Sequence, residues 1–319
     1  MNKTGEKIIK HLREKRGSFV SGSTVSLELG ISRAAVWKQI QNLRRLGYLV
    51  SARSNLGYRL DDEPDLLDSE RLQNRDIHYY KVVDSTNFVA RRLAEEGAPE
   101  YSVTLADEQL QGRGRLGRNW FSPPGSGLWF SLILRPKLIG PAEAAPITLV
   151  TAAVMANYFR LKHSLPVSVK WPNDLLLKTK KVGGILTETR GEPDRIEYLI
   201  IGIGLNVNQK PDDFPVDIGS KASSLAAESG TGFDRTALFL ALKEELIKSY
   251  RRFFVEGFPA FRRLWKNCSV TLGKEVNIRH PGGTTAGLAL DIDESGALLI
   301  KDQQGRIHTI NYGEVSQET

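Results

Sequence analysis

Three arginines and three glycines share nine residues of the chain, in the run GRGRLGRNW from Gly112 to Trp120. Glycine lets the backbone approach a ligand closely, and arginine carries a planar, permanent charge that matches phosphate or carboxylate. The run has too much glycine for a helix interior and too much charge for a core strand. We interpret residues 112–118 as a loop that binds an anion, although a solvated basic loop without a ligand has the same composition.

Two nucleotide-binding motifs are excluded. The glycines of the loop satisfy G-x-G-x-x-G, but a dinucleotide-binding motif requires a helix that begins within it, and the chain continues instead into Pro123-Pro124-Gly125. The only Gly-Lys step, Gly273-Lys274, is followed by Glu275 rather than Ser or Thr, which excludes a Walker A loop.

A second group of charged residues interrupts a strand predicted from Val167 to Leu177. It contains Lys170, Asn173 and Asp174 around a Trp-Pro step. A lysine and an acid at such a break are suited to hold the phosphates of a nucleotide and its Mg²⁺, whereas a surface ion pair is the simpler alternative.

Two strands contain glycine in their interiors. The charged turn 178–181 leads into a strand with Gly183 and Gly184, and a second strand, 198–203, contains Gly202. Such glycines often mark a place where a ligand lies against the backbone, and we expect these strands to be neighbours. Together with the basic loops they predict a pocket for an elongated ligand with an anionic end.

Three short polar residues, Ser85, Thr86 and Asn87, stand between a strand predicted over 79–83 and a helix that ends at Gly97. Ser, Thr and Asn are preferred helix N-caps, so capping alone explains them. In the alternative, they form hydrogen bonds with a small ligand.

The other elements expected to position these groups are a strand from Gly127 to Leu134, one long helix from Ala142 to Leu161 and a helix from Thr236 to Phe254. After residue 268 the chain alternates short β-type runs with Gly-containing turns. The predicted strands are 269–272, 275–278, 286–291, 297–300 and 307–310.

Composition limits the class of protein. A chain of 319 residues, 40% hydrophobic and 25% charged, is typical of a soluble protein with two or three domains. We find no apolar leader and no apolar run near the ~18 residues of a membrane span. The single cysteine, Cys268, is interpreted as a passive apolar residue in a reducing cytoplasm, and the His and Cys spacing predicts no structural zinc.

The basic residues are concentrated at one end. Residues 1–60 carry twelve Lys or Arg and three Asp or Glu, whereas the rest of the chain carries 32 and 34. Apolar spacing predicts a first helix around Ile8, Ile9 and Leu12, a second over 23–29 and a turn at Gly30. Residues 48–60 read as two strands around a polar turn, which is the pattern of a wing.

The third helix of this segment is predicted from Arg33 to Leu46, with Gly47 as its stop and Val36, Ile40 and Leu43 toward the core. The predicted DNA-binding surface is the other face of this helix, together with its N-cap residue and one residue of the wing. It consists of Ser32, Arg33, Ala34, Trp37, Lys38, Gln41 and Arg53. A three-helix interaction module that touches no DNA is the alternative. The acidic, Pro-containing segment 61–65 is a predicted linker, with a second domain that begins near Leu66.

The motifs resemble those of biotin protein ligases. The runs 84–87, 112–120, 170–174, 181–186 and 202–206 occur in the order seen in that family. With a basic helix-turn-helix in front, the whole chain is similar to the bifunctional form, which is both ligase and biotin operon repressor. One departure is Leu116, where many relatives have another arginine.

The resemblance implies an α+β multidomain fold. It predicts an N-terminal winged helix-turn-helix at 1–62, a central α/β catalytic domain similar to class II aminoacyl-tRNA synthetases at 66–268, and an SH3-like β-barrel at 269–319. It also implies a cytoplasmic enzyme that activates biotin with MgATP to biotinyl-5'-AMP and then transfers biotin to a lysine of a biotin carboxyl carrier protein domain.

The resemblance further suggests a role for each candidate residue. Arg115 and Lys181 are the predicted catalytic residues, in contact with the biotin carboxylate and the α-phosphate. The predicted biotin pocket contains Ser85, Thr86, Asn87, Gln109, Gly112, Arg113, Arg115, Lys181, Gly184 and Gly202. The weaker nucleotide-binding candidates are Arg118, Lys170, Asn173, Asp174, Asn206, Ser223 and Ser224, with Asn173 and Asp174 as ligands for Mg²⁺.

The implied partners are the carrier domain, operator DNA and a second copy of the chain, with the adenylate as corepressor of an adenylate-bound homodimer; no membrane partner is expected. Two other interpretations remain open at this point. One is a ligand-sensing repressor without catalysis, which would not need the Lys-Trp-Pro-Asn-Asp element. The other is a lipoate-attaching enzyme built on the same scaffold.

Overall fold

The computed structural model describes residues 3–45, 48–62, 67, 71–72, 75–137 and 139–317. The chain forms two compact units, residues 1–66 and 67–319, which are described separately. Leu46, Gly47, Leu66 and residues 63–65 of the predicted linker lie outside the described residues. The other two linker residues, Asp61 and Asp62, end a strand.

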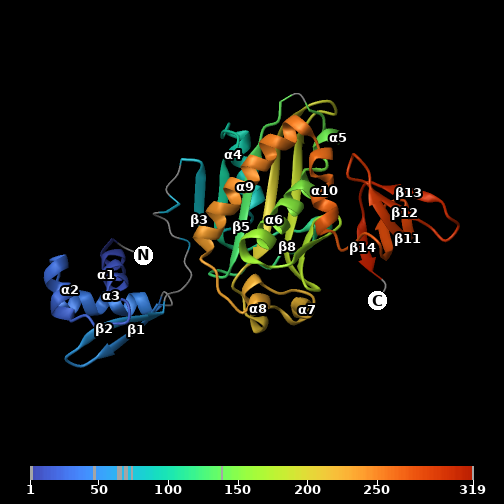
Figure 1. Ribbon diagram of the computed structural model, residues 1–319. Coiled ribbons are helices and arrows are strands. Elements are labelled where there is room, and N and C mark those ends of the chain that lie inside the picture. The colour runs from blue at the N-terminus through green and yellow to red at the C-terminus, as the bar shows by residue number, and fades with distance from the viewer. Residues whose placement is uncertain are drawn as a thin grey trace. The chain divides into compact units, whose positions relative to one another are not determined.

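The first unit has three helices followed by a hairpin (Figure 1). Its elements are α1 (Lys3–Glu14), α2 (Gly22–Leu29), α3 (Arg33–Arg45), β1 (Leu49–Arg53) and β2 (Gly57–Asp62). Gly30 ends α2 in the left-handed region at φ 64°, and the Ser32 hydroxyl accepts a hydrogen bond from the amide of Ala35, at the start of α3. Val36, Ile40 and Leu43 are buried in the core of this unit. The predicted helices and wing are confirmed.

A seven-stranded sheet forms the centre of the second unit, in the order β3-β4-β5-β9-β8-β7-β6. Its strands are β3 (Ile77–Val83), β4 (Val103–Gln109), β5 (Gly127–Leu134), β6 (Val167–Lys170), β7 (Asp174–Leu177), β8 (Lys180–Gly191) and β9 (Ile196–Asn206). Only β3 and β4 pair in parallel within this sheet. The two glycine-containing strands are neighbours, as predicted, because β8 pairs with β9 so that Gly184 lies opposite Gly204.

The two faces of this sheet have different cover. Successive residues of a strand point to opposite faces, and Leu128, Phe130 and Leu132 of β5 pack into the main core with α6 (Ile147–His163) and α9 (Arg235–Glu256). Ile133 instead packs against α4 (Thr86–Glu95), in a separate apolar cluster. Ser131 therefore lies on the α4 face of the sheet.

The predicted single helix from Ala142 to Leu161 is wrong. The chain forms α5 (Pro141–Ala144) and then α6, with Pro146 at the junction, where its ring and missing N–H prevent a continuous helix. The span Pro141–His163 is long and apolar enough to cross a membrane by length and composition, contrary to our expectation, but 67% of its apolar window is buried inside the protein. Most of this span is α6, which is a core helix of the second unit.

The C-terminal part is a five-stranded antiparallel sheet in the order β13-β12-β11-β10-β14. Its strands are β10 (Glu275–His280), β11 (Gly283–Ile292), β12 (Leu298–Lys301), β13 (Ile307–Ile310) and β14 (Glu314–Gln317). The predicted strand 269–272 is wrong, because the Ser269 hydroxyl accepts from the amides of Thr271 and Leu272 and closes a turn. Helix α10 (Pro259–Cys268) and strand β14 were not predicted.

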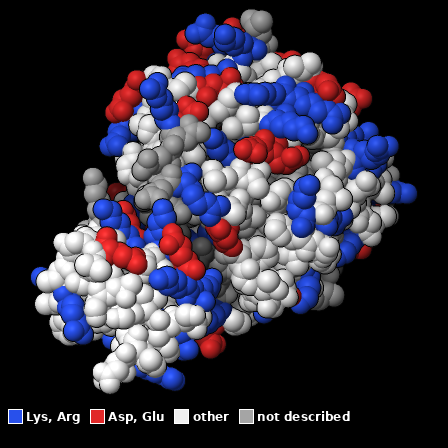
Figure 2. Space-filling model, turned by 60° about the vertical axis from the view of Figure 1, so that its left-hand side comes forward, with Lys and Arg blue, Asp and Glu red and all other residues white. Residues whose placement is uncertain are grey.

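Charged side chains of both signs are mixed over the surface. On the face of the molecule in Figure 2, Lys and Arg lie among Asp and Glu over much of the area. Exposed pairs of opposite charge also lie along helices, such as Arg92 with Glu96 and Arg252 with Glu256. The remaining short helices are η1 (Arg115–Gly117), η2 (Pro211–Asp213), α7 (Val216–Gly219) and α8 (Leu225–Ser229).

Candidate active site

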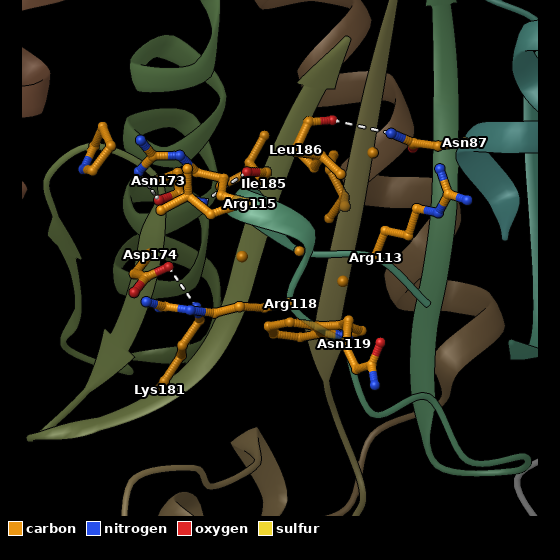
Figure 3. A pocket seen from close by; sticks show the side chains of 18 of the residues that line it. Asn87, Arg113, Arg115, Arg118, Asn119, Asn173, Asp174, Lys181, Ile185 and Leu186 are labelled. Atoms are coloured by element: carbon orange, nitrogen blue, oxygen red, sulfur yellow. Dashed lines mark hydrogen bonds and ion pairs between the residues drawn. The ribbon is translucent and has the colours of Figure 1, made fainter. Parts of the chain in front are cut away.

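A cavity on the α4 face of the sheet brings together most of the residues singled out in the sequence (Figure 3). The start of α4 contributes one side, the loop 113–120 covers it, and β7, β8 and β9 form the floor. The predicted residues that line it are Ser85, Thr86, Asn87, Gln109, Arg113, Arg115, Arg118, Lys170, Asn173, Asp174, Lys181, Gly184 and Gly202. Glu314, from β14 of the C-terminal sheet, also lines it.

Gln109 holds the beginning of α4. Its Oε1 accepts hydrogen bonds from the Thr86 amide at 2.8 Å and from the Thr86 hydroxyl at 3.1 Å, and its Nε2 donates to the Ser122 hydroxyl at 2.8 Å. Because a backbone N–H can only donate, the Thr86 amide fixes which end of the Gln109 side chain is the oxygen. The side chain of Ser85 makes no capping hydrogen bond, so capping does not explain Ser85.

Ser131 connects Thr86 to Asn87 behind the wall of the cavity. Its hydroxyl lies 2.8 Å from Thr86 Oγ1 and 2.7 Å from Asn87 Oδ1, and all three side chains are at most 5% exposed. The Nδ2 of Asn87 donates to Glu188 Oε2 at 2.9 Å, which leaves its Oδ1 facing Ser131. Ser131 and Glu188 were not predicted from the sequence. Glu188 stands among the polar residues at the end of β8, whereas Ser131, a single polar residue between Phe130 and Leu132, was the available signal.

Among Thr86, Asn87 and Ser131, the hydrogen-bond acceptors outnumber the hydrogens available to them. The Thr86 hydroxyl donates to Gln109, so toward Ser131 it presents a lone pair, and the Asn87 oxygen does the same. Ser131 has one hydroxyl hydrogen for these two acceptors. Thr86 and Asn87, which line the cavity, therefore offer acceptor capacity to a ligand that carries N–H or O–H donors.

Three glycines at the site make room for protein side chains. A Cβ at Gly202 would lie 2.0 Å from Asn87 Oδ1, and one at Gly204 would lie 2.4 Å from Trp120 Nε1. At Gly184 the ring of Trp120 is 3.2 Å from the Cβ position. These close approaches come from residues of the cavity wall itself, so glycine is needed at 202 and 204 even before any ligand is considered, whereas at Gly184 the contact is only tight. Direct ligand contact at Gly184 and Gly202 stays a prediction.

The loop 112–118, called the arginine loop below, is attached to the C-terminal sheet. Arg115 donates to Asn173 Oδ1 at 3.1 Å and to the Gly313 carbonyl at 3.0 Å, while Arg118 forms a two-pronged pair with the Glu314 carboxylate. Burial lowers the pKa of Arg115, yet an arginine keeps its charge at neutral pH. The hydrogen bond from Arg118 lowers the pKa of Glu314. Both arginines are therefore cations held at the cavity by replaceable acceptors.

Lys181 lies on the other side of the cavity. Its ammonium is 2.6 Å from Asp174 Oδ1 and 5.3 Å from the centre of the Trp120 ring. The Asp174 carboxylate is one of the hard oxygen ligands that Mg²⁺ accepts beside phosphate oxygens, and Asn173 next to it is occupied by Arg115. Figure 3 shows Lys181 and Asp174 facing each other, and Asn87 across the cavity.

Four predicted residues do not line this cavity, namely Gly112, Asn206, Ser223 and Ser224. Asn206 donates to the Ser223 carbonyl, and the Ser224 hydroxyl donates to Gln209 and caps α8. These side chains serve the local structure. Cys268 is buried and its thiol pKa is raised by burial, as expected of a passive apolar residue.

In the first unit, the predicted DNA-binding residues form the open face of α3. Ser32, Arg33, Ala34, Trp37 and Lys38 are exposed, and Gln41 is partly so. The Trp37 side chain is 58% exposed, which is unusual for so large an apolar group. In the wing, the guanidinium of Arg53 lies 5.2 Å from the centre of the Phe19 ring.

Comparison with known proteins follows the same three parts. Residues 5–59 match an HTH domain, residues 79–206 match the biotin/lipoate A/B protein ligase family, and residues 271–316 match the biotin protein ligase C terminal domain. These matches confirm the predicted fold class, from the N-terminal helix-turn-helix to the C-terminal β domain.

Individual proteins are similar over nearly the whole chain. The bifunctional ligase/repressor BirA of Bacillus spizizenii is 39% identical over 96% of this chain and 96% of its own length. BirA of Escherichia coli is 33% identical over 94% and 93%. Among solved structures, the biotin protein ligase from Aquifex aeolicus in complex with biotin and ATP is 32% identical, with a TM-score of 0.66 over 77% of this chain and 99% of that one.

Proposed function

Because the chain belongs to the biotin protein ligase family, in its bifunctional ligase/repressor form, we propose that it activates biotin with ATP, transfers it to a lysine of a carrier protein and represses transcription. The reaction gives biotinyl-5'-AMP and pyrophosphate first, and the biotinylated carrier and AMP second. The site of this reaction is the cavity between the arginine loop and β7, β8 and β9.

The observation that carries the choice of biotin over lipoate is the excess of hydrogen-bond acceptors at Thr86 and Asn87, which share one hydrogen from Ser131. The ureido ring of biotin carries two N–H donors, which can use these buried oxygens. The dithiolane ring of lipoate has no donor, so the acceptor that the Ser131 hydroxyl does not serve would stay unpaired, at about 1–3 kcal/mol. A site built to bind polar atoms rejects an analogue that lacks them.

In the first step a carboxylate oxygen of biotin attacks the α-phosphorus of ATP, and the bond to pyrophosphate breaks. Arg115 and Lys181 are placed to neutralise the charge on both reactants, once they exchange Asn173, Gly313 and Asp174 for the ligand. Trp120 and the rest of the loop would exclude water from the labile anhydride. Mg²⁺ bound with the nucleotide would offset phosphate charge, with Asp174 as its protein ligand.

In the second step the amine of the acceptor lysine attacks the carbonyl carbon of the anhydride. An amide bond forms, the bond to AMP oxygen breaks, and one proton is released. The chain's task here is to hold the anhydride in line and to stabilise the departing phosphate, again through the two cations.

The repressor activity requires a dimer, because a helix-turn-helix unit reads one half-site of an operator. We infer that the adenylate favours this dimer by ordering the arginine loop, and that a carrier which accepts biotin depletes the corepressor. A cytoplasmic location is proposed from the single cysteine, which suits a reducing compartment. Sedimentation velocity with and without biotin and ATP tests the coupling, which fails if the association constant is unchanged.

The ligase proposal is tested by mass spectrometry of a carrier domain after incubation with the full chain, MgATP and biotin. We expect one biotin on the acceptor lysine, none on a carrier with arginine at that position, and none when lipoate replaces biotin. A carrier that stays unmodified would leave only a ligand-sensing repressor, and one that takes lipoate equally well would refute the biotin assignment.

A further inference from the structure

A second cavity lies beside the site and shares part of its wall. It is bounded by the junction of α5 and α6, by Thr187 of β8 and by two loops of the C-terminal sheet. Arg115, Leu116 and Asn173 line both cavities. We propose that this second cavity is the entrance through which the acceptor lysine reaches the activated carboxyl. This inference rests on the proposed ligase function and concerns the route of its second substrate.

The two cavities differ sharply in charge. The first is lined by Arg113, Arg118, Lys170, Lys181, Asp174 and Glu314 in addition to Arg115. Within the part of the chain that the structure describes, Arg115 is the only charged residue that lines the second. Polyphosphate anions are attracted more strongly to the first opening, where several cations lie, than to the second, where Arg115 alone of the described residues is charged. The two openings are thus suited to different substrates.

An uncharged passage suits a lysine that has to react as a free amine. Attack on the anhydride needs the neutral –NH2 form, and desolvation lowers the pKa of a lysine. Its four-carbon stem can lie against Leu149 and the exposed Leu116. The hydroxyl groups of Thr148 and Thr187, which lie 2.8 Å apart, are available to hydrogen-bond the nitrogen.

Arg115 forms the partition between the cavities. It reaches from η1 to Asn173 on one side and to the Gly313 carbonyl on the other, so its side chain spans from the central sheet to the C-terminal sheet. Figure 3 shows Arg115 beside Asn173. When Arg115 turns to the ligand in the first step, it releases both contacts. The passage is therefore closed in the ligand-free site and opens once the first substrates are bound, so that the amine enters where the carboxyl is activated.

Two substitutions narrow the second cavity from opposite walls without touching the first. Ala145 is exposed at the junction of α5 and α6, and Asn311 is exposed on the C-terminal side. Ala145→Trp and Asn311→Trp each place a large ring at the opening. Ala142→Trp adds the same ring to an exposed position on α5 that does not line the cavity. It serves as the matched control.

Each variant is measured in three assays. Biotin-dependent exchange of pyrophosphate into ATP reports the first step, hydroxylamine capture of the adenylate reports access by a small amine, and biotin transfer to the carrier domain reports the lysine route. We expect Ala145→Trp and Asn311→Trp to lower kcat/KM for the carrier by about 10²-fold, because the amine is held out of line. Pyrophosphate exchange and hydroxylamine capture by these two variants should stay at the wild-type rate. For Ala142→Trp, the rates in all three assays should equal those of the wild type.

The outcomes separate the two levels of the proposal. If the wild-type chain catalyses no exchange and no transfer, the ligase function itself is wrong. If it does, and both tryptophan variants transfer biotin to the carrier as fast as wild type, the second cavity is not the entrance. Loss of transfer in Ala142→Trp as well would also overturn the assignment, since that position lies off the passage.

Discussion

Lys181 and Asp174 form an ion pair across the β7–β8 hairpin, with 2.6 Å between Nζ and Oδ1, beneath the ring of Trp120. The pair holds the lysine side chain in place beside Trp120 before a ligand arrives. When the lysine turns to the α-phosphate, Asp174 becomes free to bind a metal ion.

Lys181→Ala should slow adenylate formation by about 10²–10³, because it removes one charge contact placed in advance at the phosphoryl centre. Rapid-quench kinetics of adenylate formation measures the effect. Lys178→Ala is the control, since Lys178 pairs with Glu228 and does not line the cavity. Adenylate formed by Lys181→Ala at the wild-type rate would remove Lys181 from the mechanism.

Ser131→Ala should weaken biotin binding by about 1–3 kcal/mol, because Thr86 and Asn87 lose a buried hydrogen-bond partner and their orientation. Isothermal titration calorimetry measures the dissociation constant. Ser102→Ala makes the same change at another buried serine, whose hydroxyl has no partner among the described residues, and it should bind biotin normally. Equal affinities for the two variants would contradict the role of Ser131.

Glu314→Gln should loosen the arginine loop, because Arg118 loses its carboxylate partner. Hydrogen exchange of residues 112–118 in the ligand-free chain should become faster than in wild type, and biotin with ATP should slow it in both. An exchange rate in this segment that biotin and ATP leave unchanged would exclude the loop as a gate.

Acid should loosen the loop 112–118 of the wild-type chain, as Glu314→Gln does. The folded-state pKa of Glu314 lies below its ordinary value, chiefly through the hydrogen bond from Arg118. The stabilisation is complete above the unfolded-state pKa of about 4.3 and is lost as the pH falls through the lower folded-state value. Exchange of residues 112–118, measured relative to Glu314→Gln at each pH, should converge with that variant in this acid range. If the difference in exchange rate between wild type and Glu314→Gln stays constant down to the lowest pH, the Glu314 carboxylate is not the group that holds the loop.

Arg235→Met should destabilise the second unit by about 3–5 kcal/mol, because it leaves the Asp107 carboxylate without its partner. Arg235 is fully buried and donates to Asp107 at 2.9 Å and to the Gly127 carbonyl at 2.9 Å, which ties α9 to the base of the arginine loop. Urea unfolding followed by circular dichroism gives the free energy. Arg252→Ala, from an exposed pair, should have a much smaller effect, because solvent screens such a pair. Similar losses for both would show that burial of Arg235 is unimportant.

Arg33→Ala should weaken operator binding by about 1–3 kcal/mol and leave biotin transfer unchanged, because Arg33 lies on the exposed face of α3. Trp37→Ala should act in the same direction. Fluorescence anisotropy with labelled operator measures binding. Lys10→Ala removes one exposed charge from α1 and should have a smaller effect. If Lys10→Ala weakens binding as much as Arg33→Ala, net charge rather than the α3 face is responsible.

Local sequence predicted the elements well where one pattern dominates. The apolar run Gly127–Leu134 is a strand with those same bounds, and Val36, Ile40 and Leu43 face the core of the first unit. Errors arose where a single residue overrides a pattern. Pro146 divides the long helix, and the short polar strand β14 carries too little apolar signal to be found.

Contacts distant in sequence explain what could not be predicted at the site. The first amide of α4 is capped by Gln109, which comes 23 residues later, so the Ser-Thr-Asn sequence alone suggested the wrong cap. Gly202 and Gly204 accommodate Asn87 and Trp120, which no local rule for glycine in a strand identifies. The resemblance to a family pointed to these residues, and the structure gives the physical reason for them.

The position of Trp120 makes the site visible by spectroscopy. Among the tryptophans, Trp129, Trp171 and Trp265 are at most 2% exposed, and Trp37 lies in the first unit. Trp120 alone sits in the loop 113–120, with a lysine ammonium over its ring and a buried Nε1 that has no partner among the described residues. Trp171 lines the same cavity, so in a chain with Trp37→Phe and Trp171→Phe, changes in intrinsic fluorescence would come from Trp120 and its neighbour Trp129. Stopped-flow emission would then follow loop closure in real time, without a label.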